Sequence, residues 1–302
     1  MNKRRFSVPQ PSLNEQAKVA VVTDSVAQVP VDLARQLGIT VIPFTVQMDG
    51  RTYLDGIDIE PGELYHRMRQ DHVSPTTAAP SLGEYQRAFS SCLHGGTQSA
   101  FCISLSSKLS SGYTTACYAA NATQQEFSDR VIQVFDSRQA TISQGFVAIA
   151  AARAAMQGKS LEEVRQAAED AKQRVGFAAA LETLEYLARG GRIGKAAFMA
   201  GSLLKIKPIL SIDDEGVVAP LNRVRGECHA LQCIVEYVAH KTADCSTLRL
   251  AIMEADNPDH AAQLEELALQ TLRPVEILHS EFTPVMGVHA GPGVVGLGYY
   301  YE

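Results

Sequence analysis

We begin with Leu181–Leu210, whose sequence is LETLEYLARGGRIGKAAFMAGSLLKIKPIL and in which an apolar helical pattern breaks at Gly190-Gly191. A second helical run that carries Arg192 and Lys195 follows the break, and a strand containing a proline ends the stretch. Each glycine inside a helix costs about 1 kcal/mol relative to alanine, so the pair indicates a purpose other than helix stability. It allows either a tight corner between two helices or a close approach of the backbone and Arg192 to a ligand. Taken alone, the stretch favours the corner.

Composition and charge argue against several classes of protein. With 302 residues the chain is long enough for one or two domains, and its hydrophobic content of 46% is typical of a globular protein. The formal net charge of -6 argues against nucleic-acid binding. No apolar run approaches the ~20 residues that a membrane-spanning helix needs. The six cysteines form no CxxC pair and have no metal-type spacing, so we expect reduced thiols in a cytoplasmic protein.

The order of apolar strands and helices predicts the fold class. Residues 1–16 are basic, lack the apolar core of a signal peptide and are expected to form a disordered tail. In residues 17–175 strands alternate with helices, which predicts an N-terminal α/β domain whose mostly parallel sheet is covered by helices on both faces. Residues 176–302 contain hairpin signals as well, which predicts a C-terminal mixed α+β domain. The main strands expected in the first domain are Ala17–Val22, Ile39–Val46, Ser99–Ser104 and Val131–Phe135.

Small polar residues follow three of these strands, at Thr23-Asp24-Ser25, Leu105–Ser111 and Asp136-Ser137. Ligands of open α/β sheets bind beyond the carboxyl ends of the strands, so we expect a polar headgroup at this edge. Between strands and helices the chain has no GxxxxGK(S/T) or GxGxxG motif, and it has no GxSxG elbow and no His pair with zinc-ligand spacing. The sequence therefore argues against a nucleotide-binding loop, a hydrolase of the GxSxG type and a metal site.

A serine-rich turn is one candidate for ligand contact. Ser106, Ser107, Ser110 and Ser111 fall within six residues just before a predicted helix. One N-cap needs only one of these hydroxyls, and the free N–H groups of a helix N-terminus bind anions. Capping and ligand contact are equally supported at this turn.

Three further polar residues are candidates with weaker support. Thr77 lies in a loop bounded by prolines, where hydroxyls commonly cap turns. Arg192 follows the glycine pair, but an arginine on a helix is usually solvated. His289 lies in a stretch rich in glycine and proline that we expect to be a loop, and a loop histidine is a modest indication of function.

Together these segments resemble the DegV family of bacterial lipid-binding proteins. The matching segments run along nearly the whole chain and are Thr23-Asp24-Ser25, Thr76–Ser81, Leu105–Tyr113, Asp136-Ser137, Leu181–Leu210 and His289–Gly293. The resemblance implies two α/β domains that enclose a single long-chain fatty acid, without a cofactor or metal. It also implies a non-enzymatic carrier, which in several members is the fatty acid-binding subunit of a bacterial fatty acid kinase. Such a subunit presents the carboxylate to a separate kinase subunit that makes an acyl phosphate.

The resemblance also implies roles for individual residues. Thr77 and Ser110 would hydrogen-bond the carboxylate, while Arg192 and His289 would form a supporting network. Ser106 and Ser111, from the same turn as Ser110, are further candidate contacts.

The chain departs from the common family pattern beside two of these residues. Ala78 and Ala79 stand where Ser and Gln are common, which removes two polar side chains near the headgroup. Gly112 lies one position later than the glycine of the common Leu-Ser-Gly-Thr-Tyr pattern.

An apolar tunnel would supply ample free energy for such a ligand. At ~0.8 kcal/mol per buried methylene, a chain of about sixteen carbons offers on the order of 12 kcal/mol before ordering costs. A basic patch would help to dock an acidic kinase surface or a transient membrane contact. We expect this patch to comprise Arg189, Arg192, Lys195, Lys205 and Lys207.

Two alternatives to a carrier remain open at this point. Ser110 or Ser111 could be the nucleophile of an acyl hydrolase, with His289 as the one candidate base. The chain could also be a regulatory protein of this fold that has lost lipid binding, with Ala78 and Ala79 as traces of the loss.

Overall fold

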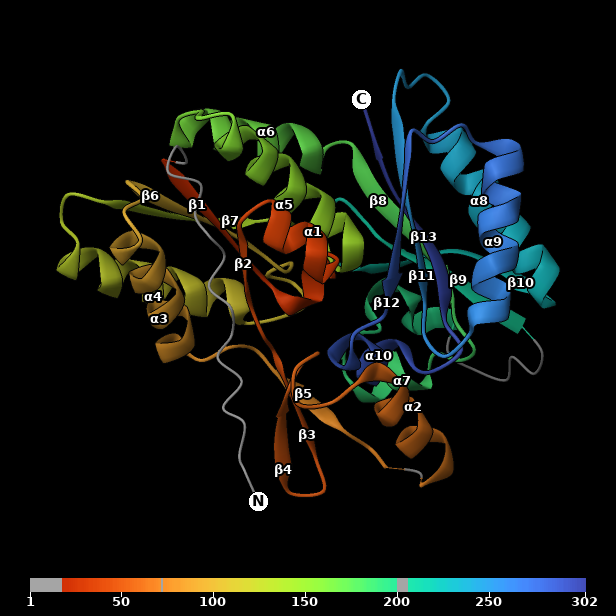
Figure 1. Ribbon diagram of the computed structural model, residues 1–302. Coiled ribbons are helices and arrows are strands. Elements are labelled where there is room, and N and C mark those ends of the chain that lie inside the picture. The colour runs from red at the N-terminus through yellow and green to blue at the C-terminus, as the bar shows by residue number, and fades with distance from the viewer. Residues whose placement is uncertain (1–17, 72, 200–205) are drawn as a thin grey trace.

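The computed structural model describes residues 18–71, 73–199 and 206–302, so the predicted tail at residues 1–16 lies outside the described residues. Its first sheet has four parallel strands in the order β2-β1-β6-β7 (Figure 1). These strands are β2 (Ile39–Ile42), β1 (Val19–Asp24), β6 (Ser99–Ser104) and β7 (Val131–Asp136). The prediction of a parallel sheet in the first part of the chain is confirmed.

Helices cover both faces of this sheet because its strands are apolar on both sides. In β1, Val19 and Val21 belong to one hydrophobic cluster, whereas Ala20 and Val22 belong to another. The helices α3 (Leu82–His94) and α4 (Gly112–Glu126) pack together over one face. Helix α5 (Thr141–Met156) packs on the other, together with α6 (Leu161–Lys172) and α1 (Val31–Gln36). Such two-sided burial is what a parallel sheet requires.

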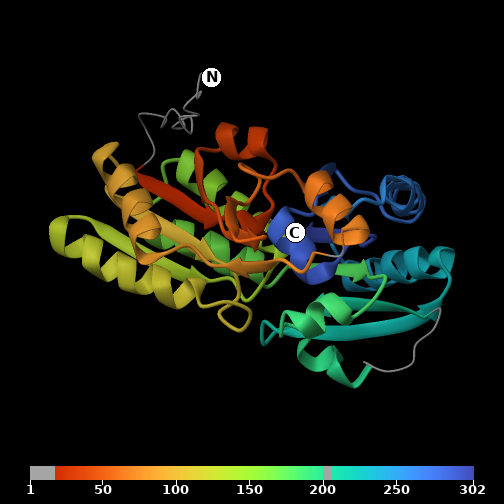
Figure 2. The same ribbon diagram turned by 90° about the horizontal axis from the view of Figure 1, so that it is seen from below.

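The second sheet has six strands in the order β10-β9-β8-β13-β11-β12, and only the β11–β12 pair is parallel. These strands are β10 (Val218–Arg225), β9 (Ile206–Ile212), β8 (Val175–Ala180), β13 (Val295–Tyr301), β11 (Leu248–Glu254) and β12 (Glu276–Glu281). Helices α8 (Glu227–Lys241) and α9 (Pro258–Thr271) pack over one face (Figure 2). The expectation of a mixed α+β layout in the second part of the chain is also confirmed.

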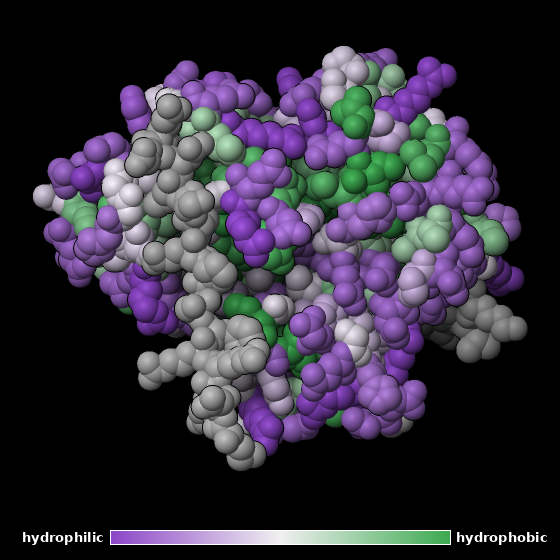
Figure 3. All heavy atoms as spheres, viewed as in Figure 1, coloured by the Kyte–Doolittle hydropathy of each residue, from purple (hydrophilic) through white to green (hydrophobic). Residues whose placement is uncertain are grey.

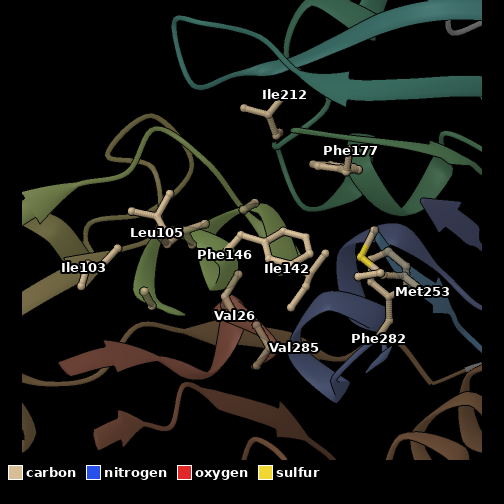
Figure 4. Packing of buried hydrophobic residues seen from close by; sticks show 14 of the residues in the cluster. Val26, Ile103, Leu105, Ile142, Phe146, Phe177, Ile212, Met253, Phe282 and Val285 are labelled. Atoms are coloured by element: carbon tan, nitrogen blue, oxygen red, sulfur yellow. The ribbon is translucent and has the colours of Figure 1, made fainter. Parts of the chain in front are cut away.

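Helix α5 lies between the two sheets and packs against both β1 and β8. Most of its residues are buried and apolar, as expected for a helix that is covered on nearly every face. Its small residues allow the close packing: a Cβ at Gly145 would lie 2.4 Å from the carbonyl oxygen of Ala27. Figure 4 shows Ile142 and Phe146 of this helix among side chains from both halves of the chain.

A third, three-stranded sheet corrects two predictions. Its strands are β4 (Arg51–Leu54), β3 (Thr45–Met48) and β5 (Thr76–Ala78), in that order. The stretch Ile39–Val46, predicted as one strand, is divided at Pro43-Phe44 between β2 and β3, which belong to different sheets. The loop predicted around Thr77 contains β5, which pairs with β3. A hairpin turn at Asp49-Gly50 joins β3 to β4, with positive φ at both residues.

Five further helices belong to the described chain: η1 (Ser25–Ala27), α2 (Pro61–Gln70), α7 (Glu185–Arg189), η2 (Gly194–Met199) and α10 (Pro284–Ala290). Of these, α10 packs against β3 and β5. His289 therefore lies on a helix, and the prediction of a loop there was wrong. The second helical run predicted after Gly191 is the 3-10 helix η2, and Arg192 precedes it.

The surface is mostly hydrophilic on the face drawn in Figure 3, with hydrophobic residues gathered near its centre. Among the helices that the structure describes, none combines the length and the hydrophobicity that crossing a bilayer requires.

Candidate functional site

A cavity of about 520 Å³ lies where the two sheets and the short helices meet. Its volume falls within the range of ~300–1,000 Å³ that is usual for small-molecule sites. Figure 4 shows part of its apolar wall, with side chains from both halves of the chain facing one another. The apolar wall includes Val26, Phe44, Leu105, Leu109, Phe177, Leu181, Leu187, Leu210, Ile212, Val218, Phe282, Val285, Met286 and Val294.

The cavity is also lined by five of the six residues that the sequence singled out for ligand contact. These residues are Thr77, Ser110, Ser111, Arg192 and His289. They come from β5, the turn before α4, the segment after α7, and α10, which are far apart in the sequence. The fold therefore places a small polar group of side chains in the wall of a largely apolar cavity.

Thr77 and His289 form the central pair of this polar group. Thr77 Oγ1 and His289 Nε2 share a hydrogen bond of 2.8 Å, although the residues are 212 positions apart. Burial lowers the pKa of His289 from 6.5 to about 4, and the positive charge of Arg192 acts in the same direction. The imidazole is therefore neutral at pH 7.

Gly190 supplies the space for this histidine. A Cβ at Gly190 would lie 2.4 Å from His289 Nδ1, which no real side chain tolerates. Gly191 is needed for a different reason, because it adopts φ +69°, and no atom lies within 4 Å of the point that a Cβ would occupy. The glycine pair thus serves both purposes that the sequence suggested: one glycine makes the turn and the other allows the close approach.

Arg192 is held at the turn by backbone carbonyl groups. Its Nε donates to Leu109 O at 3.1 Å and its Nη1 donates to Gly190 O at 2.6 Å. These contacts join the glycine turn to the serine-rich turn. The side chain is exposed, so its positive charge lies at the solvent side of the polar group.

The serines of the turn before α4 have different roles. Ser110 Oγ accepts a hydrogen bond of 3.1 Å from Gly112 N, which leaves its own proton free for another acceptor. Ser111 is exposed and is the N-cap residue of α4, but its side chain makes no capping hydrogen bond. Ser106 is fully buried, donates to Gly216 O at 2.7 Å and is not among the residues that line the cavity.

Sequence reasoning missed the residues that position α10. Asp55 is buried, accepts hydrogen bonds from Val285 N at 2.9 Å and from Ser25 Oγ at 2.6 Å, and so fixes the first turn of α10. Burial raises the pKa of this carboxyl above its usual value. Gly287 packs so closely on Tyr65 that a Cβ would lie 2.2 Å from the ring. The one available signal was Thr283-Pro284, a typical start of a helix.

The predicted basic patch is largely neutralised by neighbouring carboxylates. Lys195 pairs with Asp213 and Glu215, and Lys207 pairs with Glu182 and Glu227. Arg189 pairs with Glu185 on its own helix. Lys205 lies outside the described residues. Within the described chain, the patch therefore gives little support for docking by unpaired positive charge.

Comparison with known proteins places the chain in a family. The family model described as "Uncharacterised protein, DegV family" matches residues 18–302. The chain belongs to the DegV family. A DegV domain-containing protein of Caldanaerobacter subterraneus is 31% identical over 280 residues, which covers 93% of this chain and 98% of the relative. The DegV fold assigned from the sequence is thus confirmed.

Two solved DegV structures extend the comparison to the fold. A DegV family protein from Thermus thermophilus, described by its fatty acid binding, has a TM-score of 0.88 and 31% identity, covering 94% of this chain and 100% of its own. DegV from Bacillus subtilis, described as a fatty acid binding protein, has a TM-score of 0.83 and 30% identity, covering 95% of this chain and 100% of its own. DegV proteins similar to this chain over nearly its whole length thus bind fatty acids.

Proposed function

We propose that this DegV protein binds a single long-chain fatty acid, with the acyl chain in the cavity and the carboxylate at the polar group. The observation that carries the proposal is a largely apolar cavity whose wall includes the bonded pair Thr77 and His289. Fatty acid binding by DegV relatives that share this fold supports it. Burial of an acyl chain at ~0.8 kcal/mol per methylene would make such binding tight.

The hydrogen-bond donors that remain free in the polar group suit a carboxylate. With its proton on Nε2, the neutral His289 donates to Thr77 Oγ1, which frees the Thr77 hydroxyl to donate to the ligand. Ser110 already accepts from Gly112 N, so its hydroxyl is free to donate as well. The guanidinium of Arg192 compensates the negative charge nearby. Two hydroxyl donors and a cation meet the requirement that a partly buried carboxylate be hydrogen-bonded and balanced.

We further propose that the protein is a non-catalytic carrier that presents the carboxylate to a separate kinase subunit for acyl phosphate formation. Support comes from the exposure of two members of the polar group, Arg192 and Ser111, which would leave a bound carboxylate accessible to another protein. A partner that uses ATP is consistent with a cytoplasmic location.

The arrangement gives less support to a serine hydrolase. A nucleophile needs a base within hydrogen-bond reach, and His289 Nε2 is instead bonded to Thr77. Ser110 Oγ accepts from Gly112 N, and no hydrogen bond to His289 is observed for Ser110 or Ser111 in the described part of the chain.

Denaturing extraction of the purified protein followed by mass spectrometry tests the carrier proposal. We expect about one fatty acid per chain, whereas a lipid-free protein that also fails to bind added stearic acid would overturn the proposal. The same result would favour a regulatory protein that has lost lipid binding, with Ala78 and Ala79 in the cavity wall as traces.

Variants test the placement of the carboxylate. Thr77→Ala and Ser110→Ala should each weaken stearate binding about tenfold to a hundredfold, since a hydrogen bond to a charged group contributes about 1.5–3 kcal/mol. Ser211→Ala is a matched control, because Ser211 lines the cavity but its hydroxyl donates to Ile212 O. Equal affinities for all three variants would refute the assignment.

The kinase role has its own test. Protein loaded with fatty acid should yield acyl phosphate with ATP only when a fatty acid kinase subunit is added. Product formed by this chain alone would contradict the non-catalytic assignment. Labelling of Ser110 or Ser111 by a covalent serine probe would contradict it as well.

A further inference from the structure

The hairpin formed by β9 and β10 is anchored at its base, where β8 pairs with Ile209 and Leu210 of β9. Ile209 also packs with α8, and Lys207 forms ion pairs at the same end of the hairpin. Beyond this point the strands separate: Ser211 and Ile212 pair only with β10 among the described strands. Residues 211–219, which we call the distal hairpin, therefore project beyond the part of the sheet that holds the base.

The distal hairpin forms part of the cavity wall. Ser211, Ile212 and Val218 line the cavity, and the side chains of Ile212 and Val218 are buried. Figure 4 shows Ile212 on the opposite side of the hydrophobic cluster from Val26 and Val285, which come from η1 and α10. Movement of the distal hairpin about its base would therefore open the cavity along this side.

One hydrogen bond within the described chain ties the tip of this hairpin to the other half of the molecule. The hydroxyl of Ser106, which is fully buried, donates to Gly216 O at 2.7 Å. The contact is close, because a Cβ at Gly216 would lie 2.4 Å from Ser106 Oγ and 3.1 Å from Arg138 Cβ. The ion pairs between the tip and Lys195 stay within the second half. Figure 2 shows the teal hairpin reaching the yellow loops of the first half.

We propose that the hydrogen bond from Ser106 to Gly216 is a latch that holds the distal hairpin over the cavity, and that its release lets the fatty acid enter and leave. This inference rests on the proposed binding of a fatty acid. It gives a role in ligand exchange to Ser106, which does not line the cavity. A single hydrogen bond between neutral groups contributes little net stability, so the latch can open without unfolding the base.

A latch changes the rates of ligand exchange more than the affinity. Because Ser106 lies outside the cavity wall, its loss should favour the open hairpin equally in the loaded and the empty protein. Ser106→Ala should therefore raise the association and the dissociation rates together, about threefold to tenfold, and change the affinity less than twofold. A residue that only shapes the cavity would behave differently, because its loss would speed dissociation and weaken affinity without faster association.

Exchange of labelled ligand measures these rates. Protein loaded with deuterated stearic acid is mixed with an excess of unlabelled stearic acid, and native mass spectrometry follows the loss of label. Stopped-flow mixing with a fluorescent stearate gives the association rate. Thr97→Val is the matched control, because Thr97 is buried and its hydroxyl donates to Cys92 O at 2.8 Å. Thr97 precedes β6, whereas Ser106 follows it, so both rates should stay unchanged in this control.

Two further measurements keep the test independent of one variant. Gly216→Ala should raise both rates as Ser106→Ala does, because the new Cβ would displace Ser106 Oγ. Amide hydrogen exchange in Ser106→Ala should speed up in the distal hairpin by the same factor and stay unchanged in β8. If Ser106→Ala does not fold, Gly216→Ala and hydrogen exchange of the wild type decide, because the distal hairpin must then exchange faster than β8.

The outcomes separate the latch from the function on which it rests. Normal stearate binding with unchanged association and dissociation rates in Ser106→Ala would overturn the latch and leave fatty acid binding intact. Faster dissociation with a matching loss of affinity would overturn it as well, because Ser106 would then only shape the cavity. Failure of stearic acid to bind the wild type would count against the proposed function. Hydrogen exchange would in that case still decide whether Ser106 holds the distal hairpin.

Discussion

Replacing Gly190 with alanine is the sharpest test of how the glycine turn serves the polar group. The new Cβ would lie 2.4 Å from His289 Nδ1 and 3.0 Å from His289 Cε1, so the imidazole has to move. Overpacking of this kind costs about 1–3 kcal/mol. Loss of the 2.8 Å bond to Thr77 adds about 0.5–1.5 kcal/mol.

An opposing effect has to be subtracted from this cost. Alanine in place of glycine stabilises helical backbone by up to about 1 kcal/mol, because it restricts the unfolded chain. The backbone of Gly190 is right-handed helical, with φ -73°, so alanine can adopt it. The net result is a destabilisation of about 0.5–4.5 kcal/mol. Because the displaced histidine no longer orients Thr77, we also expect stearate affinity to fall by about tenfold or more.

Gly191→Ala is the matched control for this prediction. The neighbouring glycine has φ +69° and open space around its Cβ position, so alanine there costs about 1–2 kcal/mol of backbone strain without touching His289. Urea denaturation measures stability and displacement of a fluorescent fatty acid measures affinity. Both variants should lose stability, but Gly190→Ala alone should lose affinity. If Gly190→Ala were more stable than wild type and bound stearate normally, the steric argument would be refuted.

Three further predictions concern the frame around the cavity. Burial raises the pKa of the Asp24 carboxyl from 3.8 to about 6. Between pH 3.8 and about 6 the carboxyl is therefore protonated in the native state but ionised in the unfolded state. Stability should therefore fall by up to about 3 kcal/mol as pH rises through this interval, and Asp24→Asn should remove that part of the pH dependence in urea titrations. Gly287→Ala should destabilise by about 1–3 kcal/mol in the same assay, because its Cβ would overlap the ring of Tyr65; an unchanged midpoint would contradict the packing. Ser160→Ala removes a capping box and should cost about 1 kcal/mol in thermal unfolding with no change in stearate affinity, and a loss of binding would show that distant helix ends affect the cavity.

Local patterns were sufficient to predict most of the fold. Apolar runs ending in polar turns located β1, β6 and β7, because buried parallel strands need side chains that are apolar on both faces. The capping box at Ser160 located the start of α6, because both of its hydrogen bonds lie within four residues. Local propensity failed at Ile39–Val46, where a continuous β-forming run is divided between two sheets. Only the arrangement of the sheets in space decides that division.

The polar group of the cavity shows the same limit of prediction from local sequence patterns. The sequence identified Thr77, Ser110, Arg192 and His289 as candidates, and all four line one cavity. Their pairing could not be predicted, because Thr77 and His289 meet across 212 positions of chain. The expected loop at His289 is a helix of seven residues, too short to be stable by itself in water.

Long-range contacts hold that helix in place. The Asp55 carboxylate accepts a hydrogen bond from Val285 N in the first turn of this helix, and Tyr65 packs against Gly287. The sequence by itself determined most of the strands and helices and the residue types that a carboxylate needs. The tertiary structure decided which of those residues meet, and that Gly190 leaves the space in which the histidine sits. It also left Thr141 with a buried hydroxyl that no neighbour in the described chain satisfies. These features depend on contacts between distant segments, which no local pattern encodes.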